Sequence, residues 1–251
     1  IIPWNYPVEM TARGIAAALA TGNACVVKTP ELDPLSCHWL AQAAEAAGLP
    51  DGALNILCGY GHEAGAALAG NPNIGNVVFT GSVETGIKVA TAAAANVKPA
   101  ILELGGKSAA IVMPDADLDN FMESVRWGIY FNAGQVCSAM SRVIAHEDIH
   151  DEIIDRCVAL AEGLSVGPGI DRTDFGANMG AMVSDPQRDR AEGLVEAAAA
   201  EGASIATGVR RLNLPWSFLA PTVISDVTPD MQVAGTEVFG PVLLILKTNS
   251  E

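Results

Sequence analysis

Short aliphatic runs alternate with alanine-rich stretches of helical periodicity in the first part of the chain, and this alternation limits the possible folds more than any other feature. The runs predict strands at 24–28, 54–58, 77–80 and 100–104. The stretches beside them predict helices at 8–21, 35–47, 62–69 and 83–95. Gly or Asn follows these stretches, and both residues commonly end helices. Alternating strands and helices of this size predict a parallel sheet covered by helices.

The sequence pattern changes near Gly106, and we expect a domain boundary there. An aspartate-rich start and a wide apolar face predict one long helix over 115–135. Further strands are predicted near 141–146, 203–207, 222–226 and 241–246, with helices at 151–163 and 185–201 and a Gly- and Pro-rich loop at 166–180. The expected domains are therefore 1–106 and 107–251.

Composition and charge exclude two classes of partner. The 251 residues are 50% hydrophobic and carry a net charge of −15 with only 14 Lys and Arg residues. So few cations cannot neutralise a row of phosphates, so neither a nucleic acid nor an anionic membrane surface is an expected partner. A membrane-spanning helix needs about 20 apolar residues, and no run in the chain approaches that length.

The cysteines and histidines predict free thiols and no metal. The five cysteines are odd in number and form no C-x-x-C pair, which is typical of a cytoplasmic protein. The four histidines lack the nearby Cys or carboxylate partners of a zinc site. The first residues, IIPWNYP, have no Met, basic segment or cleavage site. We therefore expect the middle of a longer chain rather than a signal peptide.

Six short motifs follow one another in an order that is far more specific than any one of them. They are PWNYP (3–7), VVKTPE (26–31), FTGS (79–82), LELGGKS (102–108), GQVCSA (134–139) and EVFGPV (237–242). Together they resemble the aldehyde dehydrogenase superfamily over essentially the whole chain, and the motifs around 103 and 137 look most similar to its betaine-aldehyde and aminoaldehyde branch. The resemblance implies an α/β fold in which a parallel, Rossmann-like cofactor-binding sheet precedes an α/β catalytic domain, with the family pattern truncated at both ends.

Cys137 is the candidate nucleophile. A lone cysteine is more often an inert core residue. Here, however, the neighbouring Gln135 and Ser138 are polar, and a thiol in a cleft can have its pKa lowered by local dipoles. The resemblance implies that this thiol attacks an aldehyde carbon to form a thiohemiacetal. The other four cysteines match no functional position of the family and are expected to be structural.

Two further residues are candidates for the chemistry that follows the attack. The resemblance assigns Asn5 to the oxyanion hole, although an Asn in this context is also common in turns and at helix N-caps. Glu103 lies among Ile101, Leu102 and Leu104, where burial would raise its pKa and suit it to act as a general base. A strand with one outward-facing carboxylate would have the same pattern. In the family this glutamate activates the water that hydrolyses the thioester, so its presence favours release of the free acid.

The expected cofactor is NAD, with NADP disfavoured. No G-x-G-x-x-G fingerprint follows a strand, but VVFTGSVETG runs from a strand into a helix whose free N–H groups can face a pyrophosphate. The resemblance assigns cofactor contacts to Trp4, Lys28, Glu31, Gly81, Ser82, Glu237 and Phe239. Each of these also has an ordinary structural explanation, such as a solvated charge at a strand end or a turn before a buried strand.

Two alternatives from other classes remain open. A cysteine hydrolase would need a histidine base near Cys137, and His146 and His150 are candidates by sequence proximity alone. A non-catalytic fragment of the same fold is the second alternative.

The expected substrate is a small aldehyde, and Trp127, Tyr130 and Phe131 are aromatic residues suited to line its path. The parent protein is expected to form a homo-oligomer, a dimer or a tetramer.

Overall fold

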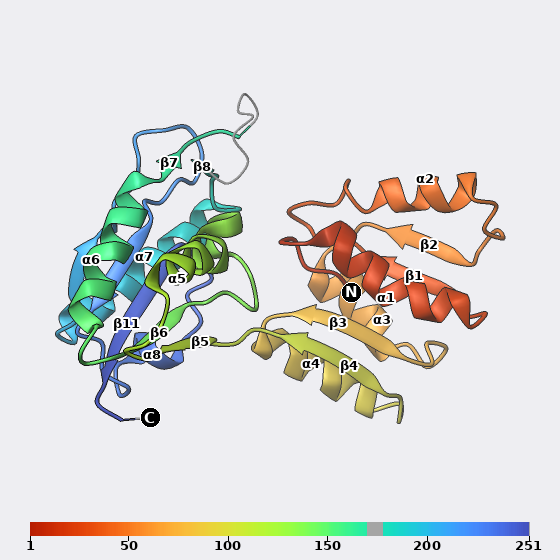
Figure 1. Ribbon diagram of the computed structural model, residues 1–251. Coiled ribbons are helices and arrows are strands. Elements are labelled where there is room, and N and C mark those ends of the chain that lie inside the picture. Colours follow the sequence, from red (N-terminus) through yellow and green to blue (C-terminus); the bar gives the residue numbers. More distant parts are fainter. Residues whose placement is uncertain (170–177, 251) are drawn as a thin grey trace. The chain divides into compact units, whose positions relative to one another are not determined.

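The computed structural model describes residues 1–169 and 178–250. The chain divides into two units, Ile1–Gly105 and Gly106–Glu251. Figure 1 draws the first unit in red to yellow and the second in green to blue. The expectation that the first binds a dinucleotide and the second is catalytic stays a prediction.

The first unit alternates helices and strands in the predicted order. Its elements are α1 (Pro7–Ala20), β1 (Cys25–Lys28), α2 (His38–Ala46), β2 (Leu54–Leu57), a π-helical turn (Gly61–Gly65) that continues into α3 (Ala66–Gly70), β3 (Val77–Gly81), α4 (Val83–Ala94) and β4 (Ala100–Leu104). Proline opens α1, where its missing N–H costs no hydrogen bond. Ser82 caps α4 by accepting a hydrogen bond from the N–H of Thr85 at 3.3 Å.

Two parallel strand pairs, β1 with β2 and β3 with β4, form the sheet layer of this unit. The first two residues connect them. The nitrogen of Ile1 donates to Val78 O at 2.8 Å, and the N–H of Thr80 donates to Ile1 O at 3.3 Å, which is the parallel pairing pattern. The N–H of Ile2 donates to Lys28 O at 3.2 Å on the other side. The carboxyl ends of these strands therefore lie along one edge of the layer.

The second unit carries a larger set of elements. They are β5 (Ala109–Val112), α5 (Leu118–Val125), a π-helical turn (Arg126–Tyr130), a 3₁₀ turn (Phe131–Gly134), β6 (Arg142–His146), α6 (His150–Gly163), β7 (Ser165–Val166), β8 (Asn178–Met179), α7 (Asp185–Ala200), β9 (Ser204–Thr207), β10 (Thr222–Ser225), α8 (Gln232–Gly235) and β11 (Val242–Thr248). Part of the predicted loop at 166–180 lies outside the described residues.

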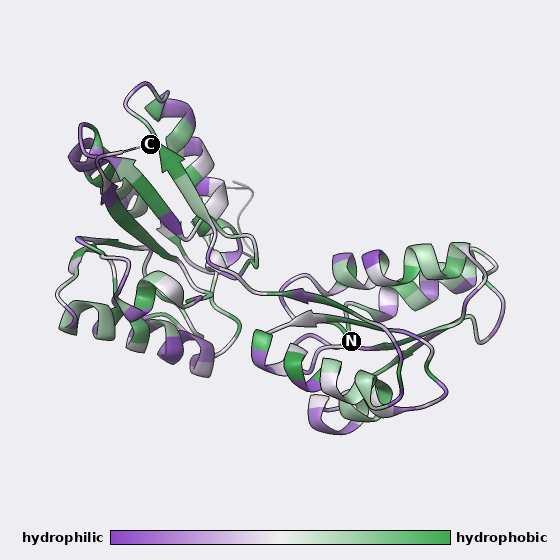
Figure 2. Cartoon of the chain, turned by 90° about the horizontal axis from the view of Figure 1, so that it is seen from below, coloured by the Kyte–Doolittle hydropathy of each residue, from purple (hydrophilic) through white to green (hydrophobic). Residues whose placement is uncertain are grey.

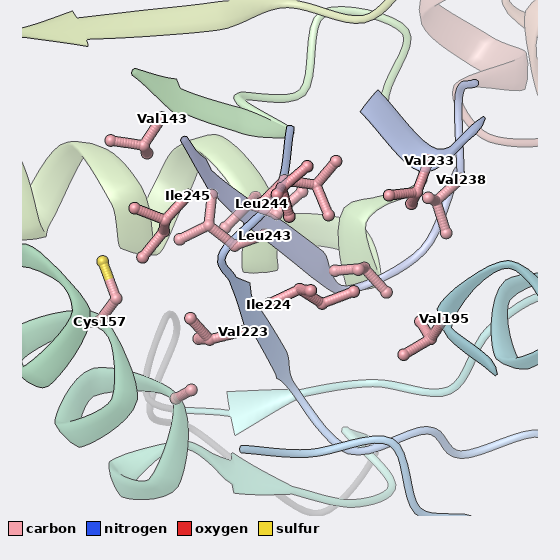
Figure 3. Packing of buried hydrophobic residues seen from close by; sticks show 14 of the residues in the cluster. Val143, Cys157, Val195, Val223, Ile224, Val233, Val238, Leu243, Leu244 and Ile245 are labelled. Carbon is pink, nitrogen blue, oxygen red and sulfur yellow. The ribbon is translucent and has the colours of Figure 1, made fainter. Parts of the chain in front are cut away.

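A five-stranded sheet in the order β5-β6-β11-β10-β9 organises the second unit. The first four strands are parallel, and β9 joins β10 antiparallel. The central strand β11 is buried on both faces, with Leu243, Leu244 and Ile245 fully buried. Figure 3 shows these side chains packed among those of Val143 and Val223 from the neighbouring strands. A continuous apolar run is the expected sequence of such a strand, because helices cover both of its faces.

The predicted helix at 115–135 is wrong in its second half. The α-helix ends at Val125, and the chain continues through the π-helical turn to Tyr130. Asn132, Ala133 and Gly134 then adopt positive φ angles of 50°, 52° and 72°, which no right-handed helix contains. Strand β5 and the short helix α8 were not predicted either.

In Figure 2 the strands of the large sheet are coloured mostly hydrophobic, and many of the purple residues lie on helices and loops. In the ranges 1–169 and 178–250, no helix combines the length and apolar character needed to cross a membrane.

Leu244→Ala tests the role of β11 in stability. The side chain is fully buried in the sheet core, so we expect its truncation to lower the free energy of unfolding by about 2–5 kcal/mol. Ile111→Ala is the control in the same sheet, because that side chain is 70% exposed and its loss should change stability by about 0.5 kcal/mol or less. Urea denaturation followed by circular dichroism measures both. Equal effects of the two substitutions would contradict this account of the core.

Candidate active site

Cys137 lies in a tight turn immediately before β6, and its side chain is exposed. The N–H of Ala139 donates to Val136 O at 3.1 Å, which places Cys137 and Ser138 at the tip of the turn. The flanking backbone is fixed, because Met140 N–H donates to Gly128 O at 2.8 Å. The thiol is therefore presented to solvent by a rigid support.

The segment before this turn depends on a close approach of two glycines. A Cβ atom on Gly134 would lie 2.1 Å from the carbonyl oxygen of Gly240, and Gly134 has a φ of +72°. Both facts require glycine. Gln135 then anchors the loop from within: it is 2% exposed, its Oε1 accepts the N–H of Val183 at 2.9 Å, and its Nε2 donates to Asn132 O at 3.0 Å.

The loop 237–240, which carries Glu237 and Phe239, is held against α7 by two side chains. Arg190 donates to Glu237 O at 2.9 Å and to Val238 O at 2.8 Å. Gln187 donates to Phe239 O at 3.0 Å. Phe239 itself has a φ of 57°, an unfavourable value for an aromatic residue, so these hydrogen bonds help to hold a strained backbone.

Glu237 and Lys107 form the charged part of the same region. The Glu237 carboxylate accepts the N–H of Gly106 at 3.3 Å. Burial raises the pKa of Glu237, against the opposing effects of that hydrogen bond and of the positive charges on Arg190 and Lys107. Burial, helped by the neighbouring Arg142, lowers the pKa of Lys107 to about 8. The second unit thus brings Glu237, Phe239 and Gly106 to one small cavity that Gly134 also lines, beside the segment that leads to Cys137.

The candidates in the first unit lie at the carboxyl edge of its strands. Trp4 and Asn5 follow the Ile1–Ile2 segment, Lys28 ends β1, and Gly81 ends β3. In open parallel sheets this edge is where ligands bind. Trp4 and Asn5 both interact with other groups of the protein.

Lys28 and Glu31 are in direct contact. The Lys28 ammonium is almost completely buried and lies 3.0 Å from Glu31 Oε1, which also accepts the N–H of Gly61. Burial opposes ionisation of Glu31, but the hydrogen bonds from Lys28 and from backbone N–H groups outweigh it and lower the pKa of this carboxyl. An ionised carboxylate on a side chain that is 43% exposed is a suitable acceptor for the hydroxyls of a sugar.

Gly81 and Ser82 form the turn from β3 into α4. A Cβ on Gly81 would lie 2.6 Å from the ring of Phe79, so the turn needs glycine or a shifted ring. The first N–H groups of α4 precede its first intrahelical hydrogen bond, and they lie beside the exposed Ser82, which accepts the one from Thr85. Such an end favours a phosphate because of both its donors and the helix dipole.

Glu103 differs from the sequence-based expectation of a buried carboxylate. Its side chain is 44% exposed, and its Oε1 accepts a hydrogen bond from Arg13 Nη2 at 2.8 Å. Both partners are about half exposed, so the pair contributes at most about 1 kcal/mol and leaves the carboxylate free to move. Sequence reasoning missed Arg13, because it lies on α1, 90 residues away from Glu103 in the chain.

The two histidines proposed as bases for a hydrolase lie at the other end of β6 from Cys137. His146 ends that strand, four residue steps or roughly 13 Å beyond Arg142. Its ring lies 3.5 Å from Asp148, and the His150 ring lies 2.8 Å from Asp151. Neither arrangement directs an imidazole toward the thiol.

The three aromatic candidates for a substrate path separate into two groups. Tyr130 is buried in the core, and burial raises the pKa of its phenol far above the ordinary value. Trp127 and Phe131 are 46% and 40% exposed, with ring centroids 6.0 Å apart. Of the three aromatic residues, only these two can meet a ligand.

Among residues 1–169 and 178–250, no three His, Cys, Asp or Glu side chains gather as metal ligands would.

Comparison with known proteins decides the family. The model of the family described as "Aldehyde dehydrogenase family" matches residues 1–251. This chain belongs to the aldehyde dehydrogenase family. The resemblance predicted from the six motifs is therefore confirmed.

Named relatives and solved structures of the family agree with this assignment. The peroxisomal aminoaldehyde dehydrogenase 1 of Pisum sativum is 44% identical over 253 residues, which covers 100% of this chain and 50% of that protein. The chloroplastic betaine aldehyde dehydrogenase of Beta vulgaris is 42% identical, with the same coverage. The NAD+ complex of an aldehyde dehydrogenase from Bacillus cereus superposes with a TM-score of 0.95 at 40% identity and covers 99% of this chain and 50% of that one.

These comparisons confirm the predicted aldehyde dehydrogenase fold, with its parallel sheets and helices. The chain spans about half the length of the curated relatives that it matches.

Arg190→Met tests whether α7 holds the loop 237–240. The substitution removes two charge-assisted hydrogen bonds to backbone carbonyls, so the free energy of local opening should fall by about 1–3 kcal/mol. Hydrogen exchange read by mass spectrometry should then show faster exchange in peptides covering 237–240.

Arg211→Met is the matched control for this experiment. Arg211 pairs with Asp189 and Glu192 on the same helix, but its exposed guanidinium makes no contact with the loop. Unchanged exchange at 237–240 in the Arg190 variant, or an equal change in the Arg211 variant, would contradict the role of Arg190 in holding this loop.

Proposed function

We propose that the protein of which this chain is part oxidises an aldehyde to the carboxylic acid with NAD, through a thioester on Cys137. The observation that carries the proposal is the exposed thiol of Cys137, which a rigid turn presents beside the segment that the Gly134–Gly240 contact fixes. Membership of the aldehyde dehydrogenase family supports it. So do the names of relatives, among them an aminoaldehyde and a betaine aldehyde dehydrogenase.

The first step is attack of the Cys137 sulfur on the aldehyde carbon. The carbonyl oxygen becomes an oxyanion, which needs hydrogen-bond donors that are already in place. In this proposal the donors are the side-chain amide of Asn5 and the backbone N–H of Cys137. The fixed backbone on both sides of the turn supports the second role, because a preorganised donor loses no energy in reorganising.

Bound NAD would supply the acceptor for the hydride of the thiohemiacetal. The residues at the carboxyl edge of the first unit fit such a group. Glu31 and Lys28 would hold the adenosine ribose, the start of α4 at Gly81 and Ser82 would face the pyrophosphate, and Trp4 would contact the same region. Glu237 and Phe239 would hold the nicotinamide ribose and ring edge. The contact between Lys28 and Glu31 and the capped helix start support this fit.

Glu103 acts in the second half of the reaction. The thioester left on Cys137 is resolved by a water molecule, and Glu103 takes the proton of that water. Its ion pair with Arg13 is weak enough to break when the carboxylate turns toward the water. The alternative of a cysteine hydrolase has no support in the geometry, because His146 and His150 are directed elsewhere.

The substrate proposed is a small aldehyde with a cationic group. Trp127 and Phe131 support it, because two exposed aromatic faces attract a positive charge.

A homo-oligomer of the parent protein, a dimer or a tetramer, and a cytoplasmic location stay predictions. The relatives named above carry peroxisomal and chloroplastic labels, and the described cysteines of this chain are free thiols, which favours a reducing compartment.

Glu103→Gln separates the two halves of this mechanism. The amide keeps the shape of the side chain but removes its basicity, so hydride transfer should proceed once and hydrolysis should stall. We expect at most one equivalent of reduced cofactor per site, a steady rate lowered by about 10²- to 10⁴-fold, and an acyl mass on Cys137.

Glu9→Gln, an exposed glutamate of α1, is the control and should leave turnover unchanged. Full steady turnover in the Glu103 variant would remove this residue from the mechanism. Loss of activity with no acyl adduct would move its role to the attack step.

The preference for NAD over NADP follows from Glu31. Its carboxylate can accept hydrogen bonds from a 2′-hydroxyl, but a 2′-phosphate there would meet a like charge. We expect kcat/KM for NAD to exceed that for NADP at least about tenfold, a difference of about 1.4 kcal/mol. Glu31→Gln should reduce this ratio. Steady-state kinetics with both cofactors measure it, and equal values for the unmodified protein would contradict the role of Glu31.

A further inference from the structure

Cys58 is a second exposed thiol with an unusual set of neighbours. It follows β2 directly, and its sulfur lies 3.4 Å from Nε2 of His38, the first residue of α2. The buried hydroxyl of Thr29, which follows β1, donates to the same sulfur at 3.5 Å. An imidazole and a hydroxyl from two other segments therefore converge on one exposed sulfur.

The other cysteines lack this arrangement. Cys37 and Cys157 are buried, and burial raises the pKa of Cys157 to about 12. Burial also raises the pKa of the partly buried Cys25. The sequence alone suggested a structural role for Cys58, but its exposure excludes a core position. The thiolate is the reactive form of cysteine, and a neighbouring imidazole can take the thiol proton while a hydroxyl donor stabilises the charge.

The position of Cys58 links it to the proposed cofactor residues. Thr29 is the neighbour of Lys28 in the chain, and its N–H donates to Leu57 O at 3.0 Å. Three residues after Cys58, the N–H of Gly61 donates to the Glu31 carboxylate. The segment 58–61 is compact, because a Cβ on Gly59 would lie 2.7 Å from the Cβ of Ala64. A group attached to the sulfur would therefore lie next to Thr29, which follows Lys28, and to the segment that donates to Glu31.

We propose that Cys58 is a modification site, a nucleophilic thiol assisted by His38 that exchanges with small disulfides, and that the resulting adduct weakens cofactor binding. The second part rests on the proposed function. In the exchange the Cys58 sulfur attacks one sulfur of the disulfide, a new S–S bond forms and the old one breaks. The other half leaves as a thiolate and takes the proton that His38 accepted. Cys58 is oxidised and the departing thiol is reduced, so no further reactant is needed.

The test of thiol reactivity uses the full chain with Cys137→Ala, which removes the other exposed thiol. Oxidised glutathione is added, and peptide mass spectrometry follows each cysteine over time. We expect Cys58 to be modified at least about tenfold faster than Cys25, and His38→Gln to slow this modification by a similar factor. His62→Gln is the matched control, because His62 stacks on Tyr60 nearby without touching the sulfur. Equal rates at Cys58 and Cys25, or no effect of His38→Gln, would overturn the assignment.

The coupling to the cofactor is measured by calorimetric titration of NAD into the same protein before and after modification. We expect the Kd for NAD to rise at least about tenfold on modification and to recover when a thiol reductant removes the adduct. In the Cys58→Ser variant, treatment with oxidised glutathione should leave the Kd unchanged. An unchanged Kd in the modified protein would overturn the coupling. Failure of NAD to bind the unmodified protein would instead contradict the proposed cofactor site, and the labelling rates would still decide the reactivity of Cys58.

Discussion

The backbone contact between Gly134 and the carbonyl of Gly240 determines the geometry of the second unit around its thiol. The two glycines come from segments more than a hundred residues apart, and no side chain fits between them, since a Cβ on Gly134 would lie 2.1 Å from that oxygen. This contact joins the loop that leads to Cys137 to the loop that carries Glu237 and Phe239. Gln135 fixes the first loop through its hydrogen bond with Val183, and Arg190 fixes the second from α7.

In the first unit, parallel strand pairing brings together residues that are distant in the sequence. Because the strands run in one direction, the residues that follow them share an edge, although they are far apart in the sequence. Lys28, Glu31 and the start of α4 become neighbours of that edge without any special motif. The same geometry gathers Thr29 and His38 around Cys58, which shows how an exposed thiol can acquire a polar environment.

Much of the fold could be predicted from local pattern. Strands such as β4 and helices such as α4 depend on short-range periodicity and stop signals, and their predicted bounds differ from the observed ones by a residue or so. The predicted helix at 115–135 failed, because its apolar pattern continues through Tyr130 while the three residues up to Gly134, where the chain meets Gly240, have positive φ. Strand β5 was missed because it is short and Ile111 is exposed.

The candidate site could be predicted only as far as its motifs extend. Cys137, Glu103 and the cofactor candidates were found because the family resemblance marks them, and their roles stay predictions. Arg13, Arg190 and Gln187 act through contacts with residues distant in sequence, so no local signal identifies them. The exposure of the Glu103 side chain could not be predicted either, because the strand pattern does not show which face of β4 the helices cover.

The central claim is that the sulfur of Cys137 carries out the chemistry. The most direct measurement is the rate at which the full-length protein forms reduced cofactor from an aldehyde and NAD, compared between Cys137→Ala and Cys25→Ala. The account predicts that the first variant falls to the background rate while it still binds NAD, and that the second retains most of its activity. Near-normal turnover in Cys137→Ala would contradict the assignment of the nucleophile and, with it, the proposed mechanism.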